Sequence, residues 1–167
     1  MKKLILFTAA AALIAASCGK KAPAPLTEQE ISDLINKVKD LPPEPVEPGE
    51  VAVLETSFGN VKVEFLTGKA PNTCANFKKL AKAGFYNGTY FHRVIPDFMI
   101  QGGDILTRDS NPANDGTGRP GYTIDAEFND VRHETGVLSM ARSQHPNSAG
   151  SQFFIMHGAA PHLDGSY

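Results

Sequence analysis

The stretch FHRVIPDFMIQGGD, residues 91–104, decides the fold that this sequence predicts. Its alternating pattern predicts two short strands, joined by a turn at Pro96-Asp97 and ended by a pair of glycines. Because side chains alternate along a strand, Arg93 shares a face with the apolar residues two positions away on either side. An arginine in such surroundings is costly unless it has a partner or a task. Two interpretations stay open, a structural arginine paired with a carboxylate and an arginine with a chemical role.

The sequence around this stretch predicts further strands and one helix. A helix is expected over 71–83, with Cys74 as a small core residue on its inward face. Asn87-Gly88 is typical of the tight turn of a hairpin. The remaining strands are expected at 51–56, 61–65, 137–141 and 152–156.

Composition indicates one compact domain with a tail, because the chain has 167 residues, of which 41% are hydrophobic and 20% charged. The 15 glycines and 12 prolines favour a fold rich in loops and strands. A formal net charge of −2 argues against nucleic acid as a partner, which requires a basic face. Cys18 and Cys74 lie in very different settings, so neither a disulfide nor a zinc site is expected.

The first 17 residues have the pattern of a targeting signal, with Lys2-Lys3 before an apolar run at 4–16 that is too short to span a bilayer. Small residues then lead to Cys18. This end resembles a bacterial lipoprotein signal, in which cleavage falls before the cysteine and lipid is attached to its thiol. The alternative is an ordinary secretory signal. We expect a membrane-anchored lipoprotein in an extracytoplasmic space, the periplasm or the cell surface.

Residues 18–50 are expected to form a tether. Thr27 and Glu30 predict a capping box at the start of an amphipathic helix over 28–40. Prolines at 42, 43, 45 and 48 then predict a stiff, extended linker. The helix either packs on a surface or is a spacer that frays, because helices this short are marginal alone.

The stretch at 91–104 also resembles the core signature of the cyclophilins, one class of peptidyl-prolyl cis-trans isomerases. Further matching pieces follow in the family's order: GTGRPGYTIDAEF at 116–128, GVLSMAR at 136–142, NSAGSQFFI at 147–155 and HLDG at 162–165. The resemblance covers residues 51–167. It implies a mostly-β domain, a cyclophilin-like antiparallel β-barrel with a packed helix, incomplete at the C-terminus because the family continues with another strand, a helix and a final strand.

The resemblance also assigns the site. Arg93 matches the catalytic arginine, and Ala141 and Arg142 match the segment whose backbone pairs with the peptide. His162 stands where several relatives carry tryptophan, and Tyr167 falls where many carry a histidine at the rim. The other matches form the apolar proline pocket, namely Phe98, Met99, Phe154 and Leu163, and the polar groups that orient the substrate, namely Gln101 and Gln152.

Prolyl isomerisation needs no cofactor and no covalent step, and no HExxH or GxSxG motif suggests other chemistry. The expected partners are proline-containing peptides and folding polypeptides, with the membrane reached through lipid on Cys18 and with neither nucleic acid nor metal. The expected function is isomerisation of X–Pro bonds during the folding of exported proteins. Two alternatives stay open: a peptide-binding or chaperone-like module without turnover, and an inactive fragment.

Overall fold

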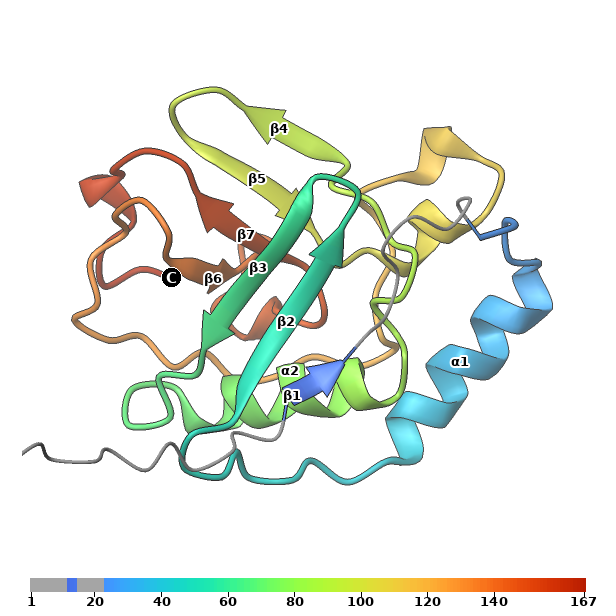
Figure 1. The fold of residues 1–167 in the computed structure, drawn as a ribbon, viewed down its shortest axis with the longest axis horizontal. Coiled ribbons are helices and arrows are strands. Elements are labelled where there is room, and N and C mark those ends of the chain that lie inside the picture. The colour runs from blue at the N-terminus through green and yellow to red at the C-terminus, as the bar shows by residue number, and fades with distance from the viewer. Residues whose placement is uncertain (1–11, 15–22) are drawn as a thin grey trace, which may run out of the picture.

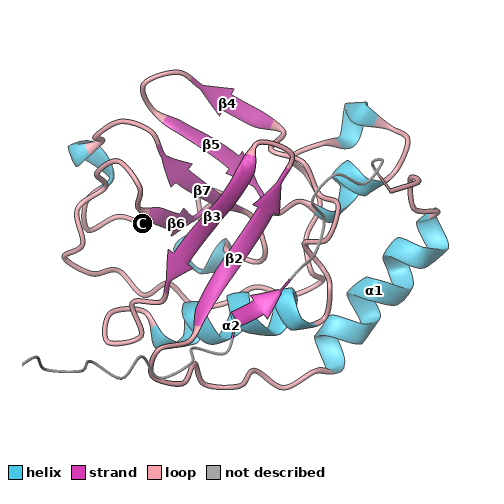
Figure 2. Cartoon of the chain, in the orientation of Figure 1, coloured by secondary structure: helices cyan, strands magenta, loops and turns pink. Residues whose placement is uncertain are grey.

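In the part of the chain that the structure describes, the fold is mostly β, with two separate sheets and two α-helices. It is known from a computed structural model that describes residues 12–14 and 23–167. The first sheet has the order β1-β2-β3 and the second the order β4-β5-β7-β6 (Figures 1 and 2). The strands are β1 (Ala12–Ile14), β2 (Val51–Thr56), β3 (Gly59–Glu64), β4 (Arg93–Ile95), β5 (Met99–Gly102), β6 (Leu138–Met140) and β7 (Phe153–Met156), and the α-helices are α1 (Glu28–Asp40) and α2 (Pro71–Lys82).

Within the described residues all strand pairs are antiparallel except β1 with β2, which is parallel. The predicted corner of the central stretch is confirmed, because β4 and β5 pair around a turn in which Asp97 adopts a positive φ of 58°. The prediction of a hairpin at Asn87-Gly88 is wrong. Gly88 does turn, with φ 75°, but the turn follows α2 and leads into coil before β4, so no strand precedes it.

The core between the two sheets is aromatic. Phe77 of α2 contacts Phe153 of β7 with ring centroids 5.4 Å apart, and Tyr86 packs against both rings. Cys74 is buried next to this core and carries a free thiol, as the sequence predicts. Burial, followed by the nearby Glu127 carboxylate, raises the pKa of this thiol.

The two sheets do not close into a barrel in the part of the chain that the structure describes. Between them lies a cavity of about 410 Å³, lined by residues of β3, α2, the segment 124–129 and β6. The exposed face of β3 and the edge strand β6 border this opening. The expectation of an open, incomplete barrel therefore agrees with the arrangement of the sheets.

Residues 23–50, which we call the strap, run along the flank of the domain (Figure 1). The predicted capping box of α1 is present, with Thr27 and Glu30 bonded reciprocally. Ile31 and Val38 of α1 are buried in one cluster with apolar side chains of the domain, namely Leu80, Phe85 and Ile105. Of the two interpretations, the structure therefore shows a helix that packs on the domain.

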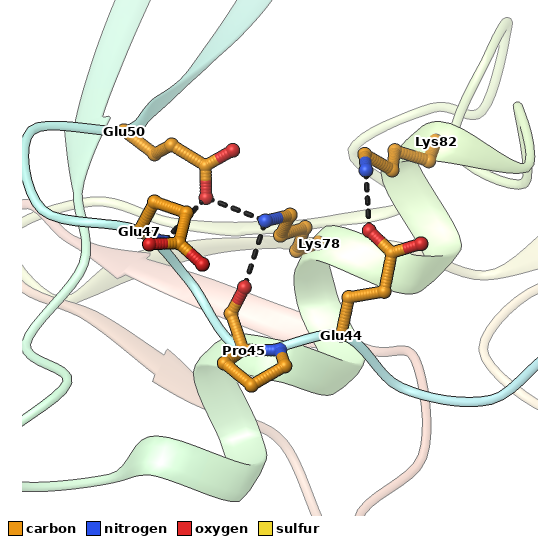
Figure 3. A network of polar contacts seen from close by, with 6 residues as sticks. All are labelled: Glu44, Pro45, Glu47, Glu50, Lys78 and Lys82. Atoms are coloured by element: carbon orange, nitrogen blue, oxygen red, sulfur yellow. Dashed lines mark hydrogen bonds and ion pairs between the residues drawn. The ribbon is translucent and has the colours of Figure 1, made fainter.

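Polar contacts hold the proline-rich end of the strap against α2 (Figure 3). Lys78, only 4% exposed, donates to Glu50 Oε2 at 2.6 Å and to the Pro45 carbonyl at 2.8 Å. Lys82 pairs with Glu44 at 2.5 Å, but both side chains are exposed. The first pair is desolvated and hydrogen-bonded on several sides, whereas the second lies in water.

The expected signal at 1–17 lies outside the described residues, apart from β1, and so does the expected lipidation site Cys18. In residues 12–14 and 23–167, no helix combines the length and the apolar character needed to cross a bilayer.

Candidate functional site

The second sheet places the predicted catalytic arginine in one row with other predicted site residues. Arg93 lies opposite Gln101 of β5, Gln101 opposite Phe154 of β7, and Phe154 opposite Ser139 of β6. Directly opposed residues share a face, and neighbouring strands lie about 4.8 Å apart. A guanidinium, an amide and an apolar ring therefore follow one another across one face of the sheet.

The Arg93 side chain is exposed and donates from Nη1 to Gln101 Oε1 at 3.2 Å. Among the described residues it has no carboxylate partner, so the interpretation as a structural ion pair finds no support. An exposed guanidinium that is oriented by an amide keeps further N–H groups available for a ligand.

A chain of amide hydrogen bonds orients this arginine. Gln101 donates to Gln152 Oε1 at 2.9 Å, and Gln152 donates to the carbonyls of Gly116 and Gly118 at 2.9 and 3.0 Å. Asp104 holds the loop in turn, by accepting from the backbone N–H of Gly116. Because each amide has both its donor and its acceptor engaged, their orientations are determined by the loop.

Gly118 shows why this loop requires glycine. A Cβ at that position would lie 1.9 Å from Asp104 Oδ1 and 2.9 Å from Leu106 N, and the fully buried Asp104 side chain is held in place by the N–H groups of Leu106 and Gly116. In the sequence, Gly116 and Gly118 stand out only as part of the segment 116–128 that matches the family. Their role in holding Gln152 was missed, and nothing short of the three-dimensional contact could have revealed it.

The predicted proline pocket is one apolar cluster. Met99 and Phe154 are buried in it together with Met156 and Ala160. The half-buried members that pack around them include four other predicted site residues, Phe98, Ala141, Leu163 and Tyr167. His162 lies at the margin, with its ring 6.0 Å from that of Phe98. The structure thus brings together apolar residues that are up to 69 positions apart, from 98 to 167.

Arg142 lies beside this cluster with its side chain engaged within the protein. Its guanidinium donates to the backbone carbonyls of Ser143 and Gln144, and to that of Ser166 at 2.8 Å. It also lies 4.3 Å over the ring of Tyr167. The side chain therefore holds Tyr167 against the pocket.

Two hollows adjoin these residues. One, of about 230 Å³, is lined by Gln101, Gln152, Ala141 and Arg142 together with loop residues that include Gly116 and Arg119. The larger cavity between the sheets is lined by their inner faces, and among the predicted site residues only Arg142 and Tyr167 reach it. We place the site at the smaller hollow, because Gln101 and Gln152, the two amides that orient Arg93, line it.

No group of histidine, cysteine or carboxylate side chains within residues 12–14 and 23–167 is arranged to hold a metal ion. A further set of polar residues, which the sequence did not single out, lies behind the pocket: His133, Ser139 and Asp164.

Comparison with known proteins agrees with this geometry. The family model described as cyclophilin type peptidyl-prolyl cis-trans isomerase/CLD matches residues 51–167. The chain belongs to the cyclophilin family. Cyclophilins are peptidyl-prolyl cis-trans isomerases, and the fold and the enzyme class expected from the sequence are thereby confirmed.

Two relatives show how similar the sequences are. A peptidyl-prolyl cis-trans isomerase of Synechococcus elongatus is 53% identical over 114 residues, which are 68% of this chain and 73% of that protein. Peptidyl-prolyl cis-trans isomerase B of Bacillus subtilis is 50% identical over 107 residues, or 63% and 69% of the two chains.

Two solved cyclophilins resemble the structure. A cyclophilin type isomerase of Cryptosporidium parvum, crystallised in the presence of the dipeptide Ala-Pro, has a TM-score of 0.59 and 37% identity, and covers 68% of this chain and 71% of its own. Cyclophilin AquaCyp293 of Hirschia baltica has a TM-score of 0.61 and 27% identity, with 85% and 68% covered.

Proposed function

We propose that this cyclophilin isomerises X–Pro bonds in exported polypeptides and assists their folding, with Arg93 as the hydrogen-bond donor that stabilises the twisted amide. The observation that carries the mechanism is the row Arg93–Gln101–Phe154 across one face of the sheet. In this row a permanently charged donor and an apolar ring lie on the same face, on either side of Gln101.

The chemistry requires no more than such a pair. The X–Pro bond is separated from its isomer by a barrier of roughly 20 kcal/mol. At the twisted transition state amide resonance is lost, so the carbonyl becomes less polar and the proline nitrogen gains a lone pair. An apolar pocket disfavours the planar, charge-separated amide, and a donor aimed at the nitrogen favours the twisted one.

The lowering of the barrier can be divided between the arginine donor and the apolar cluster. An acceleration of about 10⁵ corresponds to about 7 kcal/mol. One preorganised donor supplies about 3–4 kcal/mol. The rest is assigned to the cluster around Phe154 and to the positioning of the peptide.

The substrates we propose are proline-containing peptides and unfolded chains. A relative solved in the presence of Ala-Pro supports a proline-containing ligand for this site. The apolar cluster offers an apolar surface for the ring, and the hollow beside Gln101 and Gln152 provides room for the neighbouring peptide.

NMR exchange between the cis and trans forms of a short Ala-Pro peptide tests the mechanism. We expect the chain to accelerate exchange and Arg93→Ala to lower the acceleration about 100-fold or more while still binding the peptide. The matched control is Arg132→Ala, which removes an exposed arginine that lies in neither the hollow nor the apolar cluster and should leave the acceleration unchanged. Equal exchange by Arg93→Ala and the parent chain would disprove the donor role. Binding without acceleration in the parent chain would favour the alternative of a peptide-binding module, which the unclosed sheets make worth testing.

We also propose that the chain is exported and anchored by lipid on Cys18. The support is the order of charged, apolar and small residues before that cysteine. The test is the mass of the protein purified from a bacterial membrane fraction, compared with Cys18→Ser. Lipid mass on the parent and not on the variant is expected. An unmodified parent chain cleaved elsewhere would instead identify an ordinary secretory signal.

A further inference from the structure

His133 lies behind the apolar pocket with every polar atom engaged. Its side chain is 4% exposed. The backbone N–H donates to Asp164 Oδ1 at 2.8 Å, the ring Nδ1 lies 3.1 Å from the same oxygen, and the ring Nε2 lies 3.3 Å from Ser139 Oγ. Its carbonyl accepts from Ala160 N–H at 2.8 Å. One residue therefore joins β6, the segment before it and the turn at 160–164.

These bonds determine the tautomer of the ring. The hydrogen bonds from the His133 backbone, and then from its side chain, hold the pKa of Asp164 below its ordinary value. Asp164 is therefore a carboxylate at neutral pH and can only accept, so the proton of a neutral ring must lie on Nδ1. Nε2 is then left as an acceptor, and Ser139 donates to it.

The ring itself supports two residues of the site. It stacks on Phe154, with centroids 6.1 Å apart and planes inclined by 21°. Its edge meets Tyr167 at 6.4 Å and 83°, and Phe154 and Tyr167 meet each other at 5.9 Å. The three rings form one unit, and only His133 has polar atoms bonded to the protein behind it.

We propose that His133 is a positioning residue for the isomerase reaction. Held by Asp164 and Ser139 in its Nδ1–H form, it sets the orientation of Phe154 at the floor of the proline pocket and of Tyr167 at its rim. This inference rests on the proposed function of the pocket. Ser139 is the last residue of the row that begins at Arg93, so the contact of His133 with Ser139 lies on the same face of the sheet as the donor.

The order aspartate, histidine, serine also occurs in hydrolases with a nucleophilic serine. Here the ring is almost fully buried, stacked on Phe154 and in contact with Tyr167, so its visible task is to hold those two rings, while Ser139 is half-buried and lines the cavity between the sheets. The observations favour positioning, and nucleophilic reactivity is an outcome that the test below can reveal.

The direct test is the tautomer of His133 in the full chain, read from long-range ¹H–¹⁵N NMR spectra of the imidazole. We expect the Nδ1–H form at neutral pH, and its loss in Asp164→Ala. An Nε2–H ring in the parent chain would overturn the inference. This measurement does not depend on turnover, so a parent chain without isomerase activity would count against the proposed function alone.

The functional test compares His133→Phe, which keeps a ring but loses both polar contacts, with His157→Phe, which changes an exposed histidine after β7. We expect about a tenfold loss in kcat/KM for His133→Phe, mostly through a higher KM, and no change for His157→Phe. Asp164→Asn keeps an acceptor oxygen and should retain most activity, whereas Asp164→Ala should not. Should His133→Phe fail to fold, the Asp164 pair still decides.

Parent-like KM and kcat in a folded His133→Phe protein, or in Asp164→Ala, would contradict a positioning role. Labelling of the parent chain by a fluorophosphonate, abolished by Ser139→Ala, would overturn it in favour of a nucleophilic serine.

Discussion

The two flanks of this cyclophilin differ in packing, since one is covered by the strap and the other is open to a cavity. On one flank the strap covers α2 with buried aliphatic side chains and a desolvated ion pair. On the other, the inner faces of two sheets enclose a cavity of about 410 Å³ that no described residue fills. The difference shows that a family match is not the boundary of a packed unit, because the match begins at residue 51 while the packing begins earlier.

We expect the largest loss of stability from a charge placed in the apolar cluster between the strap and the domain. Val38 is fully buried, and Val38→Asp places an unpaired carboxylate among apolar side chains. We expect the free energy of unfolding to fall by about 4 kcal/mol, measured by urea denaturation. Val61→Asp, at an exposed position of β3 beside the cavity, is the matched control and should cost less than about 1 kcal/mol. Equal costs would mean that the strap does not pack as described.

The two ion pairs between the strap and α2 differ in burial, and we expect them to differ in their contribution to stability (Figure 3). Lys78→Met removes the ammonium group from the Pro45 carbonyl and from the Glu50 carboxylate, which is 17% exposed and keeps the backbone N–H of Glu47 as a donor. We expect a loss of about 2 kcal/mol. Lys82→Met breaks the exposed pair with Glu44 and should cost about 0–1 kcal/mol. A Lys82 variant as damaging as the Lys78 variant would contradict the assignment of the buried contact.

On the open flank, Glu127 provides a pH-dependent contact. It accepts from the backbone N–H groups of Asn72 and Thr73, and so caps α2, whose own N-cap residue Ala70 offers no side-chain acceptor. Burial alone would raise the pKa of Glu127, but these hydrogen bonds outweigh it and hold the pKa below the ordinary 4.5.

A carboxyl group whose pKa is lower in the folded state stabilises the fold above its unfolded pKa and loses that contribution as pH falls through the folded value. We therefore expect Glu127→Gln to cost about 1 kcal/mol at pH 7 and progressively less below pH about 4.5. Urea denaturation at both pH values measures this. A cost that grows on acidification would have the wrong sign and would refute the cap.

The smallest effect concerns the Cys74 thiol, which lines the cavity but is buried and has a raised pKa. In Cys18→Ser protein at pH 8, we expect a bulky disulfide reagent to react about 100-fold more slowly than with a free cysteine. A small methanethiosulfonate should react faster than the bulky reagent, because the cavity admits it. Identical rates for both reagents would show that access through the cavity does not limit the reaction.

Much of this molecule follows from its sequence because the relevant signals are local. The capping box at Thr27, the turn at Pro96-Asp97 and the strand expected at 152–156 each depend on signals within a few residues, and each is present, the last as β7. The hairpin expected at Asn87-Gly88 fails because a local turn signal does not say what precedes it.

Contacts between distant residues could not be predicted from local pattern. From local sequence, Lys78 would be expected in solvent on the surface of a helix. It is buried because Glu50 and Pro45 of the strap pack against it. In the sequence, His133 is one of five histidines and nothing distinguishes it. Its partners Phe154 and Asp164 lie 21 and 31 positions later and contact it only in the folded protein. The row from Arg93 to Phe154 was available only through the resemblance to a family, since strand register is a property of the folded sheet.

The place where the strap meets the domain has a mechanical meaning. Leu26 donates to the Arg108 carbonyl at 2.7 Å, and Pro23 lies against Gly88, so the strap is fixed to the domain at its first residues, well before Val51. A pull applied at residue 23 would load the contacts between α1 and the domain first, whereas a pull applied ahead of residue 12 would first load the pairing of β1 with β2. An attachment at residue 23 would therefore act on the packed strap and domain together, and it would fix the direction in which the pocket faces.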